Sequence, residues 1–367
     1  MKLLLSPGAR NYSSACQSLL SFFCASLILT VTSPTSVQAI DFNQDIRPLL
    51  SNNCFACHGP DAETREADLR LDIRKDAIKD NDGIQAIVPG NAKESEIILR
   101  IFSDDPDSVM PPPDSQKKLS ALEKETLKKW VESGAPYQEH WSFQPIASHE
   151  VPHVTSSIHN SDLSDIDRFL LRKLRSKDLD LSPTADPTTL IRRLSFDLLG
   201  LPARSEWVEK YSSNPTQETY SKIVDEMIAS PHFGERMAVF WLDLVRYADT
   251  IGYHSDTHRE VSGYRDYVIN SFNFNKRYDQ FTIEQLAGDL LDQSNPWNRI
   301  ASGYNRLLQT TEEGGAQAKE YRAIYAADRV RNVSGVWLGT TMGCAQCHDH
   351  KYDPFTMKDF YSLAAFF

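Results

Sequence analysis

The residues with the clearest chemistry form two copies of the pattern Cys-x-x-Cys-His, at positions 54–58 and 344–348. Two thiols three residues apart lie on one helix face, where they can form thioether bonds to the two vinyl groups of one porphyrin. The next residue presents an imidazole to the iron, and the whole pattern is the signature of c-type haem attachment. The sequence therefore predicts haem c at both copies, held by Cys54, Cys57, His58, Cys344, Cys347 and His348.

The cysteine count agrees with this assignment. The chain has six cysteines, and the other two, Cys16 and Cys24, lie in an apolar N-terminal segment that we expect to be removed. No cysteine is then left for a structural disulfide, whereas small secreted disulfide scaffolds are dense in cysteine. We therefore expect all four motif thiols to serve in binding a cofactor.

The first 39 residues have the features of a secretory signal peptide. Lys2 and Arg10 precede an apolar run over 19–31, and small or aliphatic residues end the segment at Ala39. The run is short for a membrane span, which needs about 20 residues, although an uncleaved anchor stays an alternative. We expect an exported chain, periplasmic or extracellular, with no stable membrane span after cleavage of the signal.

The mature chain is expected to be acidic. Without Lys2 and Arg10, 37 of the 39 basic residues remain against 50 acidic ones. An acidic chain is a poor ligand for nucleic acid, so we expect as partner a redox protein or a small-molecule electron donor or acceptor. About 330 mature residues are enough for two or three domains.

The first domain is expected over 40–140. A helix is predicted to run through 41–50 into the first motif, and a second, capped by Ser120 and Glu123, to end before Gly134. We expect the sixth iron ligand to come from the segment between these helices. Met110 precedes three prolines that stiffen the backbone, and a thioether opposite histidine raises the reduction potential, although methionine also fills gaps in cores.

Several stretches of this domain resemble the planctomycete cytochrome C domain. They are FNQDIRPLL at 42–50, CFACHGP at 54–60, LRLD at 69–72, VPG at 88–90 and MPP at 110–112. The resemblance implies a cytochrome-c-like fold, with Cys54, Cys57, His58 and Met110 as the haem residues.

A linker is expected over 141–162, and a second domain over 163–367. The linker contains His149, His153 and His159, which we interpret as solvated because their spacings share no helix face; metal binding is the alternative. The second domain has helical periodicity, notably over 186–200, 237–248 and 264–272, and no clear alternating strand. The predicted fold class is therefore mainly α, a cytochrome-c-like helical domain followed by a second, mostly α-helical domain.

The second domain resembles the domain of unknown function that follows the planctomycete cytochrome C domain in large exported proteins. The matching stretches are IDRF at 166–169, LIRRLSFDLLGLP at 190–202, RYADT at 246–250, QLAGD at 285–289 and GCAQCHDHKYDP at 343–354. This resemblance implies an architecture but no reaction. It also implies a further C-terminal domain, so we expect the chain to be a fragment.

The second motif leaves alternatives open. Its distal ligand could be His254, His258 or Met342, or the sixth position could stay open to small molecules. Zinc held by the motif residues with His350 is a rival, and so is a dithiol or disulfide pair. A further set of neighbours, Asp349, His350 and Asp353, could do acid and base chemistry or tune the iron, or could cap a helix and pair with Lys351 or Arg331.

The sequence therefore predicts an exported c-type cytochrome that transfers electrons. The alternative is a haem-containing oxidoreductase that acts on an extracytoplasmic substrate, which could be derived from carbohydrate, with the cytochrome as its electron outlet. A structural or binding module that carries a cytochrome is a third class.

Overall fold

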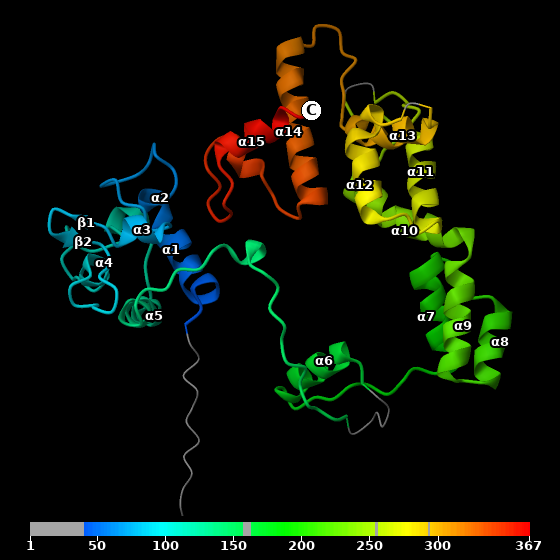
Figure 1. Cartoon of the computed structure of the whole chain (residues 1–367), viewed down its shortest axis with the longest axis horizontal. Helices are drawn as coiled ribbons and strands as arrows, with labels where there is room; N and C mark the ends of the chain where they lie inside the picture. The colour runs from blue at the N-terminus through cyan, green and yellow to red at the C-terminus, as the bar shows by residue number, and fades with distance from the viewer. Residues whose placement is uncertain (1–39, 157–162, 254–255, 293) are drawn as a thin grey trace, which may run out of the picture. The chain divides into compact units, whose positions relative to one another are not determined.

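The computed structural model describes residues 40–156, 163–253, 256–292 and 294–367. The expected signal peptide with Cys16 and Cys24 lies outside the described residues, as do His159 and His254. In the described part, fifteen α-helices accompany a single two-stranded sheet (Figure 1). The predicted class, mainly α, is confirmed.

The helices before residue 140 are short and surround one core. The elements are a π-helical turn Phe42–Ile46, α1 Arg47–Asn53, α2 Phe55–His58, α3 Arg74–Ala77, β1 Asp80–Asn81, β2 Ile84–Gln85, α4 Glu96–Ile101 and α5 Ala121–Glu132. The two strands pair antiparallel, with Asp80 opposite Gln85.

An aromatic cluster holds the start of this region to its end. The ring of Phe42 lies 4.5 Å from that of Tyr137 and 5.9 Å from that of Trp130, centre to centre. Trp130 is fully buried, and its indole N–H donates to the carbonyl of Pro136. Such packed aromatic pairs stabilise a core beyond the area that they bury. The first helix and α5 are thereby held in one core.

The bounds of α5 agree with the residues that predicted them. Ser120 and Glu123 form the predicted capping box, and Gly134, with a φ of +99°, ends the helix in the left-handed conformation. Leu122 is 77% exposed, while Leu127 is buried. The helix is rotated so that Leu127, Trp130 and Val131 face the core.

The predicted helix over 41–50 is interrupted. The N–H of Arg47 donates to the carbonyl of Phe42, five residues earlier, which makes a π-helical turn before α1 begins. Pro48 has no N–H and cannot continue the preceding hydrogen-bond pattern, so the change of helix type falls next to it.

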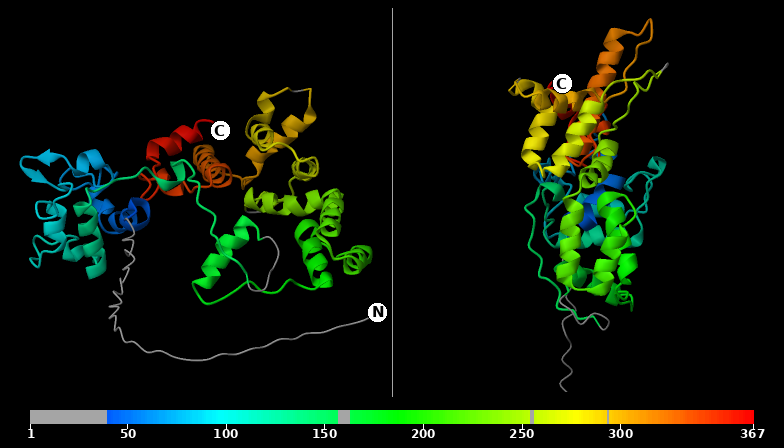
Figure 2. Two further views of the ribbon diagram at one scale, coloured as in Figure 1. Left: turned by 60° about the horizontal axis from the view of Figure 1, so that its bottom comes forward. Right: turned by 90° about the vertical axis from the view of Figure 1, so that its right-hand side faces the viewer.

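The later helices are longer. They are α6 Asp165–Arg175, α7 Pro187–Leu199, α8 Ser205–Ser213, α9 Gln217–Ile228, α10 Pro231–Leu244, α11 Ser262–Asn273, α12 Tyr278–Ala287, α13 Pro296–Ala301, α14 Ala318–Trp337 and α15 Met357–Ala364. Helices α7, α8 and α9 lie side by side around one hydrophobic cluster (Figures 1 and 2). Across the described ranges, no helix is both long and apolar enough to pass through a bilayer.

Caps set the bounds of α7, which agree with the helix expected over 186–200. Asp186 accepts from the N–H of Thr189, Pro187 is the first helical residue, and Gly200 ends the helix with a φ of +68°. The stripe predicted over 237–248 was only partly right, because α10 ends at Leu244 and Phe240 is 57% exposed under the guanidinium of Arg236. In α11 the predicted face is correct: Tyr264 and Tyr267 are buried.

Candidate haem-attachment sites

The first motif forms a single helical turn. Cys54 ends α1 and begins α2, and its carbonyl accepts from the N–H groups of Cys57 at 3.1 Å and His58 at 2.8 Å. Phe55 anchors the turn in the core, whereas Cys57 is exposed. The turn thus holds the two thiols and the imidazole of one motif close together in space.

Gly59 is required by the backbone that follows. A β-carbon at this position would lie 2.2 Å from the carbonyl oxygen of Phe55, far inside van der Waals contact. Only glycine allows the chain to leave the motif turn in this direction.

The imidazole of His58 is held in the tautomer that an iron ligand needs. Its Nδ1 lies 3.2 Å from the carbonyl oxygen of Glu66, and a carbonyl can only accept, so Nδ1 carries the proton. Burial lowers the pKa of His58, against the opposing effect of the Glu66 carbonyl, and the charge of Arg100 lowers it further. The neutral ring then has its lone pair on Nε2, the usual arrangement for a metal-bound histidine.

Hydrogen bonds fix the loop after the motif against it. The N–H of Glu66 donates to the carbonyl of Cys57, and that of Leu71 to the carbonyl of His58. The carbonyl of Leu71 in turn accepts from the hydroxyl of Tyr137. This chain of contacts connects the motif to the aromatic cluster of the core.

Burial disfavours the thiolate form of Cys54. Burial, and then the neighbouring Cys57, raise the pKa of Cys54 to about 12. A buried thiol of this kind is a poor thiolate ligand for a metal ion. A thioether bond to a porphyrin vinyl group is compatible with this burial, because the thioether sulfur is uncharged.

Met110 lies in a loop that is fastened to the last turn of α4. Its N–H donates to the carbonyl of Arg100 at 3.2 Å, and its side chain is half-buried. Arg100 is also the residue whose charge acts on the pKa of His58. Met110 is thus anchored through its backbone to the end of α4.

The second motif is built differently. Residues Gly343–Gln346 form a 3-10 turn anchored by the fully buried Ala345, and both thiols are exposed. The Nδ1 of His348 lies 2.8 Å from the carbonyl oxygen of Asp349, so this ring too carries its proton on Nδ1 and leaves Nε2 free. The two motif histidines thus share one tautomer and one kind of partner.

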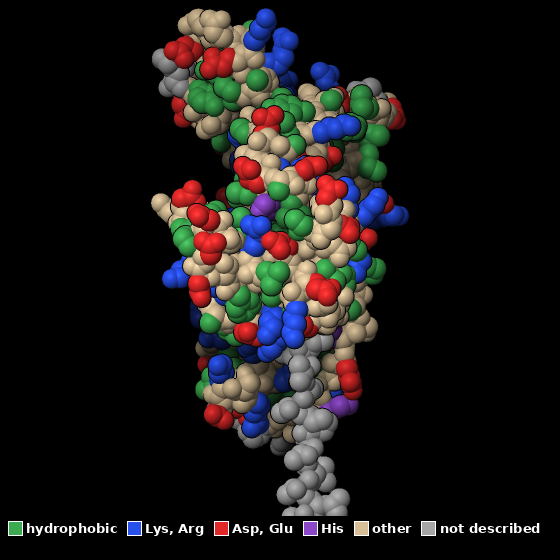
Figure 3. Space-filling view, turned by 90° about the vertical axis from the view of Figure 1, so that its left-hand side faces the viewer, with side chains coloured by type: hydrophobic (Ala, Val, Ile, Leu, Met, Phe, Trp, Pro, Cys, Tyr) green, Lys and Arg blue, Asp and Glu red, His purple; other side chains and the backbone are tan. Residues whose placement is uncertain are grey.

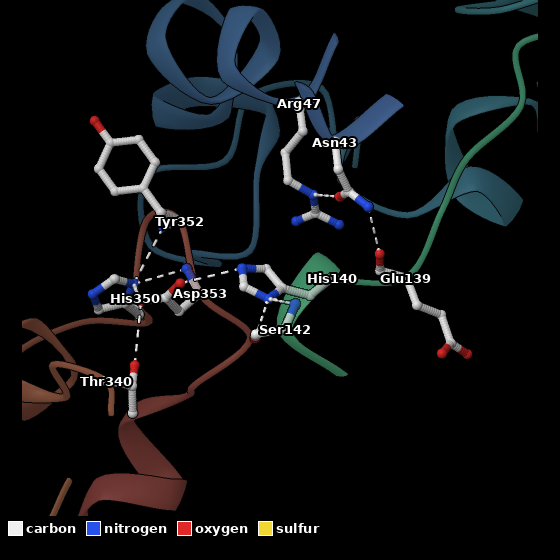
Figure 4. A network of polar contacts seen from close by, with 9 residues as sticks. All are labelled: Asn43, Arg47, Glu139, His140, Ser142, Thr340, His350, Tyr352 and Asp353. Atoms are coloured by element: carbon white, nitrogen blue, oxygen red, sulfur yellow. Dashed lines mark hydrogen bonds and ion pairs between the residues drawn. The ribbon is translucent and has the colours of Figure 1, made fainter. Parts of the chain in front are cut away.

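His350 has a different role from His348. It is buried, and its Nδ1 accepts from the N–H groups of Tyr352 at 3.3 Å and Asp353 at 2.9 Å (Figure 4). The lone pair of Nδ1 is therefore used to hold the loop after the motif. Asp349 accepts from the N–H of Met357 at the start of α15, which is the capping role left open by the sequence.

Lys351 and Arg331, which the sequence left open as pairing partners of these side chains, make other contacts. Lys351 lies over the ring of Tyr352, and Arg331 donates to the side chain of Gln346. Asp353 instead contacts His140, whose Nε2 lies 3.2 Å from its Oδ1 (Figure 4). Burial lowers the pKa of His140, an effect that the carboxylate of Asp353 opposes.

The other candidate ligands lie elsewhere. Met342 is 2% exposed and packs in a hydrophobic cluster with Ala345 and Phe360, as a core methionine does. His258 is exposed beside Glu260, and the two side chains line a cavity at the start of α11. In the described stretches, no group of three or more His, Cys, Asp or Glu side chains is arranged to hold a metal ion.

The surroundings of the two motifs are in contact. The hydroxyl of Tyr352, four residues after His348, donates to Oδ1 of Asn52, two residues before Cys54. The charge of Asp353 also acts on the pKa of Arg47, which burial lowers. No periodicity or motif in the sequence indicated these contacts, because the partners are some 300 residues apart.

The fold and the two turns together define an α-helical protein with cytochrome-c-type motifs, and comparison with known families agrees. Residues 165–367 match the family described as protein of unknown function (DUF1549), PSCyt2, and residues 54–114 match planctomycete cytochrome C, PSCyt1. The chain belongs to the DUF1549 family, whose match covers more than half of it, and it carries a cytochrome-c-like domain before that region. No curated protein and no solved structure is detectably similar to it.

Proposed function

We propose that this protein is an exported c-type cytochrome that transfers electrons through covalently bound haem. Cys54 and Cys57 would attach the first haem, His58 would be the proximal ligand and Met110 the distal one. Cys344, Cys347 and His348 would hold a second haem. Bound haem supplies one-electron chemistry at an iron whose ligands set its potential.

The shared state of the two motif histidines is the observation that carries the proposal. Each ring has its Nδ1 against a backbone carbonyl, from Glu66 and from Asp349. This contact orients the ring and leaves the lone pair of Nε2 free to bind iron. The cytochrome match, which spans Cys54, Cys57, His58 and Met110, supports the first site independently.

The proposal includes transfer between the two haems. The hydrogen bond from Tyr352 to Asn52 supports it, because each residue lies within four positions of a motif. His140, just before the proposed linker over 141–162, adds a second contact to the same loop through Asp353. Both contacts join residues before position 141 to the loop after the second motif.

The proposed external partner is a redox protein or a small electron donor or acceptor. On the face seen in Figure 3, acidic, basic and hydrophobic side chains are interspersed. With a net charge of −11 for the whole chain, we expect a basic protein to associate faster than an acidic one at low salt. Export through a signal peptide over 1–39 is part of the proposal.

Intact-mass measurement with a pyridine haemochrome assay on the purified mature chain tests the proposal. We expect a mass increase of two porphyrins, and of one in each of two matched variants, Cys54→Ala with Cys57→Ala and Cys344→Ala with Cys347→Ala. If the unmodified chain gains only one porphyrin, and the variant Cys344→Ala with Cys347→Ala gains one as well, the second motif does not bind haem. A colourless chain without added mass would overturn the proposal.

A further inference from the structure

A cavity of about 670 Å³ lies beside α11, α13 and α14, away from both motifs in the sequence. Its volume is within the range of about 300–1,000 Å³ that is usual for small-molecule sites. Four arginines line it, and we call it the arginine cleft: Arg259, Arg299, Arg306 and Arg329.

The charge of the arginine cleft is opposite to that of the chain. Besides the four arginines, its charged lining consists of Glu260 and Glu312, with His258 as a further titratable group. The lining is therefore net positive, whereas the whole chain has a net charge of −11. A local reversal of sign in a concave site raises the local concentration of an anionic ligand.

Arg259 is a structural part of the wall. Its guanidinium donates to the carbonyls of Arg306 at 2.6 Å and Leu308 at 3.1 Å, and to the hydroxyl of Thr310. It holds the chain after α13 in place and has little capacity left for a ligand.

Arg329 is oriented but has no carboxylate partner in the described part of the chain. Its Nε donates to the carbonyl of Asn305 at 3.2 Å, which fixes the plane of the guanidinium. The neighbouring Asp328 is already used, because it accepts two hydrogen bonds from Arg246, at 2.5 and 2.9 Å. Burial lowers the pKa of Arg329, an effect that the charge of Asp328 opposes. A half-buried guanidinium in this state is stabilised by any anion that reaches it.

Arg299 and Arg306 complete the cationic side. Both are exposed, and neither forms an ion pair with a residue in the described ranges. A guanidinium presents a planar fork of donors that matches the oxygens of a carboxylate, sulfate or phosphate.

The acidic side of the cleft is suited to hydroxyl groups. Glu312 accepts from the hydroxyl of Thr257 at 3.1 Å, and Glu260 accepts from the hydroxyl of Ser262. Both carboxylates thus already bind hydroxyls of the protein, and each has oxygen lone pairs to spare. Ile251, Ile300 and Leu308 supply apolar surface for the body of a ligand.

We propose that the arginine cleft binds a hydroxylated organic anion of about monosaccharide size, with its carboxylate, sulfate or phosphate group at Arg299, Arg306 and Arg329 and its hydroxyls at the glutamates. This site is independent of the proposed haem chemistry. It assigns to the DUF1549 region a ligand class that the family description does not give.

Isothermal titration of the full haem-loaded chain tests this. The probes are glucuronate, glucose 6-sulfate and glucose 6-phosphate, with glucose as the uncharged counterpart, at about 0.15 M salt so that weak surface charge effects are screened. We expect saturable binding of at least one anion and none of glucose. The anion that binds identifies the recognised group. Failure of all three anions, or equal binding of glucose, would overturn the proposal.

Two variants locate the binding. Arg306→Gln and Arg299→Gln remove exposed guanidiniums without ion pairs in the described ranges, so both variants should fold, and each should weaken the affinity by about tenfold or more. Arg193→Gln removes the same charge from the exposed surface of α7 and serves as the matched control. If Arg193→Gln weakens the affinity for the anion equally, the effect comes from the net charge of the chain, which contradicts the assigned site.

Discussion

The hydroxyl of Tyr352 donates a hydrogen bond of 3.1 Å to Oδ1 of Asn52, and so connects the loop after the second Cys-x-x-Cys-His motif to the helix before the first. The ring of Tyr352 is half exposed, and the ammonium of Lys351 lies over it. Water competes for a contact of this kind, so it is expected to contribute little to stability.

A double-mutant cycle measures this contact. For Asn52→Ala and Tyr352→Phe, unfolding by denaturant should give a coupling free energy of about 0.5 kcal/mol, the low end of the usual net value of a hydrogen bond. The control is Tyr361→Phe, which removes a comparable exposed hydroxyl that donates to Gln346. Tyr361→Phe should show no coupling to Asn52→Ala. A coupling of zero for Tyr352 would mean that the contact is absent in solution.

Gly59→Ala should disrupt the first motif. Its β-carbon would meet the carbonyl oxygen of Phe55 at 2.2 Å, so the turn that presents His58 must move, and we expect a loss of about 2 kcal/mol or more with reduced haem content. Unfolding curves and the absorbance ratio of haem to protein measure both effects.

Gly335→Ala is the matched control. Gly335 lies inside α14, where an added β-carbon meets nothing within 4 Å, so alanine should stabilise the chain by about 0.5–1 kcal/mol. Equal effects of the two substitutions would contradict the role assigned to Gly59.

Met110→Ala tests the proposed distal ligand. Methionine opposite histidine raises the potential of a haem iron, so its loss should lower the reduction potential of one haem and change its visible spectrum. Met357→Ala, at an exposed position on α15, should leave both unchanged. An unaltered potential in Met110→Ala would place the distal ligand elsewhere.

The sequence predicted the parts of this structure that depend on neighbours in the chain. Ser120 caps α5 through a neighbour three residues away, and the helices expected to end before Gly134 and to span 186–200 have these bounds. The exposure of Leu122 was not predictable in this way, because a leucine that faces away from the core fits the same short-range pattern as Leu127.

The candidate sites were likewise predictable only where they depend on residues close in sequence. The spacing of the motif residues predicted the two turns, but not that carbonyls of Glu66 and Asp349 would hold the two imidazoles. The arginine cleft was also missed, since its residues come from α11, α13, α14, the 3-10 helix Ser302–Arg306 and two loops that only the tertiary fold brings together. Backbone partners and long-range neighbours leave no periodic signal in a single sequence.

The buried carboxylate of Glu284 makes stability depend on pH in the acidic range. Burial raises the pKa of this group, but hydrogen bonds from Lys276, Tyr267 and Gln280 outweigh it, and the net pKa lies below the ordinary value of 4.5. Because the folded chain holds this proton less tightly than the unfolded one, the stabilisation is fully present above about pH 4.5 and is lost as the pH falls through the lowered pKa.

Glu284→Gln should therefore remove part of this pH dependence. At pH 7 we expect a loss of about 2–4 kcal/mol, because the ammonium of Lys276, which is only 21% exposed, is left without its carboxylate. Glu218→Gln breaks the exposed pair with Lys222, where water screens the charges, and should have little effect on stability. Denaturant unfolding of the three chains between pH 7 and pH 3 measures both effects.

The difference in the free energy of unfolding between wild type and Glu284→Gln should narrow as the pH falls below about 4.5. A difference that stays constant over this range would show that Glu284 acts through packing and not through its charge.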